Sequence, residues 1–165
     1  MSRLLEAGSQ RRASILDAAI PVFGRFGFKK TSVEDLAEAA SISKQGLYLH
    51  FSTKEESFLA AMQKYSDDGL SLVQQELTRR QTSLFARLTG AMDVWFGRHL
   101  ATFTPESFDV IEASNRLPGN QFEEYKFSFQ AKITKTLADS PAFKRAKNTC
   151  TPEEIAQVLF VFGLS

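Results

Sequence analysis

The sequence has 165 residues, a formal net charge of +1, 43% hydrophobic residues and one cysteine, Cys150. This length and apolar content allow one or two domains with a real core, and the near-neutral charge excludes a strongly basic protein that coats nucleic acid. A single cysteine excludes an intramolecular disulfide, and the chain shows neither the roughly 18 consecutive apolar residues of a membrane span nor a signal peptide. We therefore expect a cytoplasmic protein with no membrane partner.

Apolar residues at helical spacing predict a first helix, whose inner face is formed by Ile15, Ala19, Val22, Phe23 and Phe26. Gly27 follows this face at the place where a left-handed C-terminal cap is expected. The first helix is therefore predicted to end near Gly27.

A short second helix is predicted from Val33 to about Ala40, with its apolar residues on one side. Two capping boxes compete for its start. Thr31 with Glu34 and Ser32 with Asp35 both have the required spacing.

A third helix is predicted from Lys44 to Phe51, after the break Ser41-Ile42-Ser43 and with Ser43 as its cap. A fourth helix is expected from about Lys54 to about Arg79, because Thr53 and Glu56 form another capping box.

Hydroxyl-proline pairs mark the later helix starts at Thr104-Pro105, Ser140-Pro141 and Thr151-Pro152. Further helices are expected near residues 82–103, 105–115, 120–138 and from 152 onward, with a turn at 117–120. No strand signal accompanies them, so the predicted fold class is all-α. The last helix is still strongly apolar from Val158 to Phe162 where the sequence stops. We expect either that the native chain continues or that a partner subunit covers this face.

Helix two, a three-residue turn and helix three form a predicted helix-turn-helix. In such a motif the start of the second helix of the pair enters the DNA major groove, so small and polar residues are needed there. Lys44, Gln45 and Gly46 occupy that position; Lys pairs with guanine and Gln with adenine. Gly46 costs about 1 kcal/mol in a helix, which favours a close approach to bases as its reason. Ser32, Ser43 and Lys54 lie near helix starts that suit phosphate.

The stretch from Arg12 to Met62 resembles the tetracycline-repressor (TetR-like) family of transcription regulators. The most specific part is the run Gly46-Leu47-Tyr48-Leu49-His50-Phe51 followed by Lys54; Ile15 to Ala19, Phe26-Gly27-Phe28, Thr31-Ser32-Val33 and Leu36-Ala37 also match. The resemblance implies a three-helix helix-turn-helix head, residues 1–53. It implies that residues 54–165 form a larger helical domain for ligand binding and dimerisation, and the apolar end of the sequence leads us to expect that this domain is truncated at its C-terminus.

The resemblance also implies roles for single residues. Lys44, Gln45 and Gly46 match positions that face base edges, and the backbone-contacting positions are matched by Tyr48, His50 and Lys54. Phosphate-contacting hydroxyls are matched by Thr31, Ser32 and Ser43, and packing positions by Leu36, Ala37, Leu47 and Phe51. The alternative for Tyr48 and His50 is an ordinary core or surface position.

An effector pocket is a second expectation, since the family places one between C-terminal helices. Candidate residues share helix faces: Met92, Trp95, Phe96, His99 and Phe103 on one helix, and Phe122, Tyr125 and Phe129 on another. Polar-tipped aromatics suit a mostly apolar cavity, which indicates an apolar or aromatic ligand. The alternative is that these side chains are plain core.

The sequence therefore predicts a homodimeric repressor that binds a palindromic operator in double-stranded DNA and is released by a small-molecule effector. An enzyme is the first alternative, but no metal spacing, phosphate loop or nucleophile elbow occurs, so we expect neither catalysis nor a cofactor. A helical protein-interaction module is the second alternative, and an activator within the same family is the third.

Overall fold

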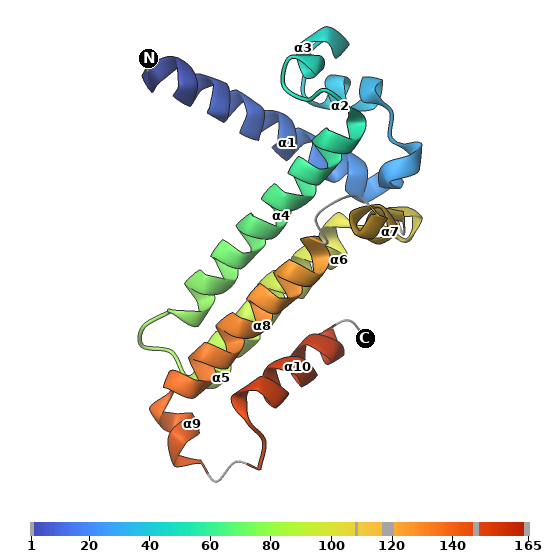
Figure 1. Ribbon diagram of the computed structural model, residues 1–165. Helices are drawn as coiled ribbons and strands as arrows, with labels where there is room; N and C mark the ends of the chain where they lie inside the picture. The colour runs from blue at the N-terminus through green and yellow to red at the C-terminus, as the bar shows by residue number, and fades with distance from the viewer. Residues whose placement is uncertain (1, 108, 117–120, 147–148, 164–165) are drawn as a thin grey trace. The chain divides into compact units, whose positions relative to one another are not determined.

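The computed structural model describes residues 2–107, 109–116, 121–146 and 149–163, and every element within these ranges is helical (Figure 1). The predicted all-α fold class is confirmed. In chain order the elements are α1 (Ser2–Lys30), α2 (Val33–Ala39), α3 (Lys44–Tyr48), α4 (Lys54–Leu77), α5 (Leu84–Met92), the π-helical turn η1 (Asp93–Gly97), α6 (Arg98–Thr102), the 3-10 turn η2 (Pro105–Ser107), α7 (Asp109–Arg116), α8 (Gln121–Asp139), α9 (Pro141–Arg145) and α10 (Pro152–Gly163).

The chain forms two compact units. The first unit comprises residues 1–66 and 101–121, and the second comprises residues 67–100 and 122–165. The division therefore falls within α4, whereas the sequence placed a functional boundary between residues 53 and 54. The first half of α4 belongs with the head because it buries Phe58, Ala61 and Met62 in the core of the first unit. The functional division itself stays a prediction.

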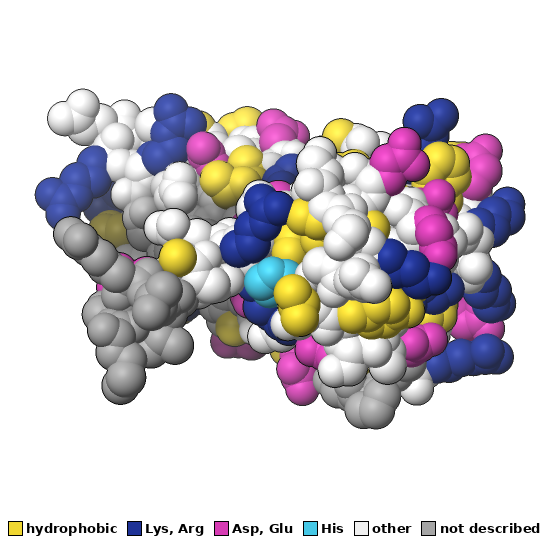
Figure 2. Space-filling model, turned by 90° about the horizontal axis from the view of Figure 1, so that it is seen from above, with side chains coloured by type: hydrophobic (Ala, Val, Ile, Leu, Met, Phe, Trp, Pro, Cys, Tyr) yellow, Lys and Arg dark blue, Asp and Glu magenta, His cyan; other side chains and the backbone are white. Residues whose placement is uncertain are grey.

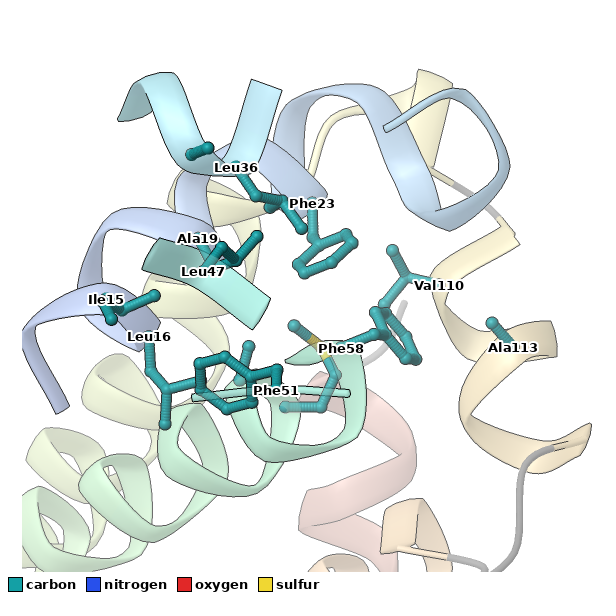
Figure 3. Close-up of a cluster of buried hydrophobic side chains, with 13 residues drawn as sticks. Ile15, Leu16, Ala19, Phe23, Leu36, Leu47, Phe51, Phe58, Val110 and Ala113 are labelled. Carbon is teal, nitrogen blue, oxygen red and sulfur yellow. The ribbon is translucent and has the colours of Figure 1, made fainter. Parts of the chain in front are cut away.

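The core of the first unit joins the first three helices to the start of α4 and to α7 (Figure 3). Phe23 from α1 and Phe58 from α4 are both fully buried, and their rings meet edge to face with centroids 5.1 Å apart. Leu36, Leu47 and Phe51 complete this core, each at most 3% exposed. Burial of such side chains contributes roughly 1.5–3 kcal/mol each, so the apolar face read from the sequence holds the head together.

The second unit has its own aromatic core. The ring of Phe129 on α8 is fully buried, stacks on Trp95 at 5.0 Å and meets Phe96 edge to face at 5.9 Å. Phe160 on α10 contacts the same ring at 5.9 Å. By contrast, α10 leaves Val158, Val161 and Phe162 at least 51% exposed. The helix predicted to lack cover is therefore half packed and half exposed among the described residues.

Gly27 breaks the end of α1 as predicted, although helical structure resumes to Lys30. Its φ of 77° and ψ of 179° form a conformation that is open essentially to glycine alone. A Cβ at this position would lie 2.0 Å from Oδ1 of Asp109, so glycine is also required by close packing. The segment before α7 docks alongside, since the Thr104 amide donates to the Gly24 carbonyl at 3.0 Å.

The competing capping boxes of α2 are resolved in favour of Ser32. Its hydroxyl accepts from the Asp35 amide at 3.1 Å, and the Asp35 carboxylate accepts from the Ser32 amide at 2.8 Å. The alternative box with Thr31 is wrong, because Thr31 is buried and its hydroxyl donates to the Gly27 carbonyl at 2.6 Å. The later helix starts at Ser140 and Thr151 follow the predicted pattern, with each hydroxyl accepting from an amide three residues on.

The span predicted as one helix at 82–103 is α5 and α6 joined by the wide turn η1, and the segment 105–115 is a 3-10 turn followed by α7. The predicted turn at 117–120 lies outside the described residues. Within the described part of the chain, no helix combines the length and apolar character needed to cross a membrane.

Candidate nucleic-acid interface

The turn between α2 and α3 is a compact backbone motif. The Ile42 amide donates to the Ala37 carbonyl at 3.0 Å, and the Ser41 amide donates to the Glu38 carbonyl at 2.9 Å. This pair of bonds is the Schellman motif, whose capping residue takes a left-handed conformation. Ser41 takes it with φ 53°. The motif fixes the direction in which the chain enters α3.

The N-terminal end of α3 presents its polar residues to solvent. Ser43 caps the helix as predicted, its hydroxyl accepting from the Gly46 amide at 3.0 Å. Lys44 and Gln45 follow, both exposed, and Tyr48 is 47% exposed. The helix ends at Tyr48, three residues earlier than predicted, because the chain then turns to bury Phe51.

Gly46 has a local packing reason that the sequence did not reveal. A Cβ at Gly46 would lie 3.3 Å from the Ser43 hydroxyl oxygen, which is closer than an ordinary van der Waals contact. It would lie 3.5 Å from the Ile42 side chain, which is an ordinary contact distance. Local packing is therefore an alternative to the predicted close approach to bases as the reason for this glycine.

Lys44 forms an ion pair with Glu34 across the motif. Its Nζ donates to the Glu34 carboxylate, and both side chains stay about half exposed, at 49% and 63%. The hydrogen bond from Lys44 lowers the pKa of Glu34, and the same bond raises the pKa of Lys44. Both groups are therefore charged at neutral pH. Sequence reasoning considered Glu34 only as part of a capping box and did not predict its pairing with Lys44, because the ten-residue separation becomes a contact only in the folded motif.

Arg12 on α1 is a further residue whose role the sequence did not reveal. Its guanidinium donates to the His50 carbonyl, pairs with Glu56 at 3.5 Å and lies 4.1 Å above the Phe51 ring. It thus joins α1 to the end of α3 and the start of α4. The structure gives Arg12 a role in positioning α3.

Lys54 and Thr31 make contacts within the head that the sequence did not predict. Lys54 Nζ donates to the carbonyls of Phe28 at 3.0 Å and Thr31 at 3.1 Å, and it lies 4.4 Å from the Phe28 ring centroid. Thr31 is 1% exposed, so its hydroxyl is not at the surface. Both residues stabilise the join between α1 and α2 because tertiary packing draws them inward.

The other predicted head residues lie at or near the surface. Ser32 and His50 are partly exposed and Ser43 is exposed. Leu49 is 86% exposed, which sequence reasoning missed. The spacing of Leu47, Leu49 and Phe51 was the available signal. A segment that buries Leu47 and Phe51 directs the side chain of Leu49 toward solvent.

Charge on this face is mixed rather than uniformly basic. Figure 2 looks onto the end that carries α2 and α3, and Lys and Arg side chains there are interspersed with acidic and hydrophobic ones. Contacts between this surface and an anionic polymer must therefore be made by a few individually positioned side chains, because the surface is not uniformly positive.

The residues predicted to line an effector pocket are divided between the two units. Phe103 lies in the first unit, where its ring meets Tyr65 edge to face at 5.3 Å. Met92, Trp95, Phe96 and Phe129 lie together in the second unit, and the side chain of Phe122 lies outside the described residues.

The polar-tipped candidates are also in the second unit. The Tyr125 hydroxyl donates to Asp67 at 3.1 Å; burial raises its pKa first, and this bond raises it further. Burial, followed by the charge of Arg98, lowers the pKa of His99.

Two open grooves of about 750 and 600 Å³ lie between the second half of α4 and α8 in the second unit. Both are lined by polar residues such as Gln74, Thr78 and Lys132, and none of the predicted effector residues lines either groove. Among the described residues, no cluster of three His, Cys, Asp or Glu side chains is arranged to hold a metal ion.

Comparison with known proteins agrees with the geometry of the head. A family model described as bacterial regulatory proteins, tetR family, matches residues 15–61. The HTH-type transcriptional activator FasR of Mycolicibacterium smegmatis is 38% identical over 87 residues, which are 53% of this chain and 39% of that protein. This chain therefore aligns with well under half the length of that relative, which is named as a transcriptional activator.

Solved structures share the fold over most of the chain. The reduced form of Escherichia coli NemR superposes with a TM-score of 0.75 at 15% identity, covering 93% of this chain and 84% of that one. AibR, solved in complex with isovaleryl coenzyme A and operator DNA, gives a TM-score of 0.67 at 19% identity, with coverage of 93% and 84%. The resemblance of the head to the tetR family of bacterial regulatory proteins is therefore confirmed over residues 15–61.

Proposed function

We propose that this chain is a sequence-specific DNA-binding transcription regulator that acts as a repressor in the cytoplasm. The observation that carries the proposal is the exposed start of α3, with Lys44, Gln45 and Tyr48 outward on a helix anchored by buried Leu47 and Phe51. A rigid helix that presents polar side chains at its N-terminal end suits the major groove.

Base and phosphate contacts divide along α3. Lys44 and Gln45 face base edges, where they pair with guanine and adenine, and Gly46 lets the helix approach. Phosphates are contacted by Ser32, Ser43, Tyr48 and His50, which positions the head without reading sequence. Two N–H groups of Lys54 donate to backbone carbonyls, and its third N–H contacts a phosphate.

Two heads act together in a homodimer that reads a palindromic operator. A single head with mixed surface charge binds weakly, and two heads fixed at one spacing multiply the affinity. Support for a dimer comes from α10, whose Val158, Val161 and Phe162 are exposed apolar residues on one short helix.

Release by an apolar or aromatic small molecule completes the proposal. Trp95, Phe129 and Met92 supply apolar surface in the second unit, while His99 and Tyr125 supply polar groups. The full burial of Phe129 favours a core role for that residue, so the ligand is expected beside Trp95. AibR and a Bacillus subtilis FadR were solved with coenzyme A thioesters, which adds acyl-coenzyme A to the candidate effectors.

The DNA-binding proposal is tested by selecting preferred duplexes from a random pool with the full chain, then measuring affinity by fluorescence anisotropy. Gln45→Ala is expected to lose about 1–3 kcal/mol at one base pair of each half-site. Tyr48→Ala is expected to weaken binding to all sequences alike. Gln75→Ala, the same change at an exposed position of the second unit, is the control. Equal affinity of wild type for every duplex would favour the protein-interaction module instead.

The effector proposal uses Trp95, the only tryptophan, as an internal reporter. A ligand beside this ring is expected to change its fluorescence and to lower the affinity of the chain for the selected duplex. Candidate libraries contain aromatic acids and acyl-coenzyme A thioesters. A ligand that raises DNA affinity instead would indicate a co-repressor, and reporter-gene induction by the protein itself would indicate an activator, as FasR is named.

A further inference from the structure

The start of α3 carries a partner of opposite charge within its own motif. Lys44 Nζ donates to the carboxylate of Glu34, which lies in the first turn of α2. The two side chains are 49% and 63% exposed. The ammonium expected to read a base is therefore already engaged when no DNA is bound.

Glu34 is available for this pairing because the neighbouring acid is not. The Asp35 carboxylate accepts from both the amide and the hydroxyl of Ser32, at 2.8 and 2.7 Å, as part of the α2 cap. Glu38, one turn further along α2, is exposed and has no ion pair among the described residues. The α2 cap therefore engages the carboxylate of Asp35, whereas the carboxylate of Glu34 bonds with Lys44.

A carboxylate on a DNA-facing surface repels phosphate, so Glu34 lowers the affinity of the head for any duplex. Its effect on Lys44, in contrast, favours specificity. An unpaired lysine is a flexible point charge that binds whichever phosphate is near, and such contacts carry no sequence information. A paired lysine is held at one place on the motif.

We propose that Glu34 is a specificity residue, which restrains Lys44 through their ion pair and prevents it from binding phosphates indiscriminately. On a duplex without acceptors opposite Lys44, the ammonium stays with Glu34 and the carboxylate discourages binding. On a duplex that offers guanine O6 and N7 at that position, two acceptors compete for the ammonium and draw it into the groove. Discrimination arises because the wrong sequence is penalised. The inference rests on the proposed function.

The test measures affinity of the full chain for its selected duplex and for a scrambled duplex of the same length, over a range of salt concentrations. Glu34→Gln is expected to bind the scrambled duplex about two- to tenfold more tightly, since two exposed ion pairs are removed from a dimer. The slope of log affinity against log salt should steepen by about one for each head as Lys44 gains a phosphate. Affinity for the selected duplex should change less, so the ratio of the two affinities falls.

Glu38→Gln is the matched control, because it removes the same charge from the same helix without touching Lys44. It is expected to tighten both duplexes equally and to leave their ratio unchanged. A second arm repeats Glu34→Gln in a Lys44→Gln background, where no further change in the ratio is expected.

Two results overturn the inference while the proposed function stands. One is an unchanged affinity ratio in Glu34→Gln, identical to the control. The other is a lowered ratio that persists in the Lys44→Gln background, because Glu34 would then act without Lys44. Wild type that prefers no duplex at all overturns the proposed function itself.

Discussion

The carboxylate of Asp109 accepts a hydrogen bond of 2.6 Å from the backbone amide of Lys29, eighty positions earlier in the chain. Its other oxygen accepts from the Phe28 amide at 3.0 Å. An acid on α7 thus satisfies two amides that the break at Gly27 releases from α1. The end of α1 is held by a side chain that belongs to a distant part of the sequence.

Removing this acceptor is expected to destabilise the first unit. Asp109→Ala leaves two amides without a partner, and we expect a loss of about 1–2 kcal/mol in the free energy of unfolding, measured by urea denaturation. Glu112→Gln, which removes exposed ion pairs with Lys29 and Arg116, is the control and should cost less than about 1 kcal/mol. Equal losses in both variants would mean that the Asp109 bonds contribute no more than surface charge.

Lys54 is expected to stabilise the first unit whether or not DNA is bound. Its ammonium donates to two backbone carbonyls, and Lys54→Met leaves both carbonyls without this donor. We expect a loss of about 1–2 kcal/mol by thermal unfolding. Tyr48→Ala, at an exposed position, should change stability by less than about 0.5 kcal/mol. A Lys54→Met protein as stable as wild type would return Lys54 to the DNA-contacting residues alone.

Ser41 offers a stabilising substitution. Its φ of 53° lies in the left-handed region, which costs roughly 1 kcal/mol for a residue with a Cβ and little for glycine. Ser41→Gly is therefore expected to raise the free energy of unfolding by about 0.5–1 kcal/mol. The same change at Ser71, an exposed position inside α4, should lower it by a similar amount. Loss of stability in both variants would contradict the Schellman geometry.

Glu56 gives the head an acid-sensitive contact. A hydrogen bond from the Ser52 amide lowers the pKa of Glu56 from its ordinary value of 4.5, and Arg12 lowers it further. A lowered folded-state pKa means that the stabilisation is complete above about pH 4.5 and is lost as the pH falls through the folded-state value. Glu56→Gln should therefore be less stable than wild type in urea unfolding at about pH 6, and the difference should shrink as the pH is lowered below about 4.5.

The exposed neighbour Glu55 supplies the control for this measurement. Glu55→Gln should show no such convergence, since the Ser52 amide bonds only with Glu56 of the two. A stability difference between wild type and Glu56→Gln that stays constant across the pH range would contradict the role assigned to the carboxylate.

Local sequence determined where the helices of the head begin and which residues they bury. A capping hydroxyl bonds to an amide three residues away, so Ser43 could be identified from spacing alone. Apolar periodicity predicted that Leu36 faces inward, and the family resemblance implied packing roles for Leu47 and Phe51; all three are buried. The exposed start of α3 at Lys44 and Gln45 follows from the same local pattern.

Tertiary structure alone decided what the long charged side chains do. Lys54 reaches carbonyls 26 and 23 positions away, Arg12 reaches the His50 carbonyl 38 positions away, and Asp109 reaches Lys29 across 80. A flexible charged side chain bonds to whatever partner packing brings near, and sequence spacing does not encode that partner. The pairing of Lys44 with Glu34 belongs to this class, which is why the sequence indicated a base-reading lysine and only the folded motif revealed the acid that holds it.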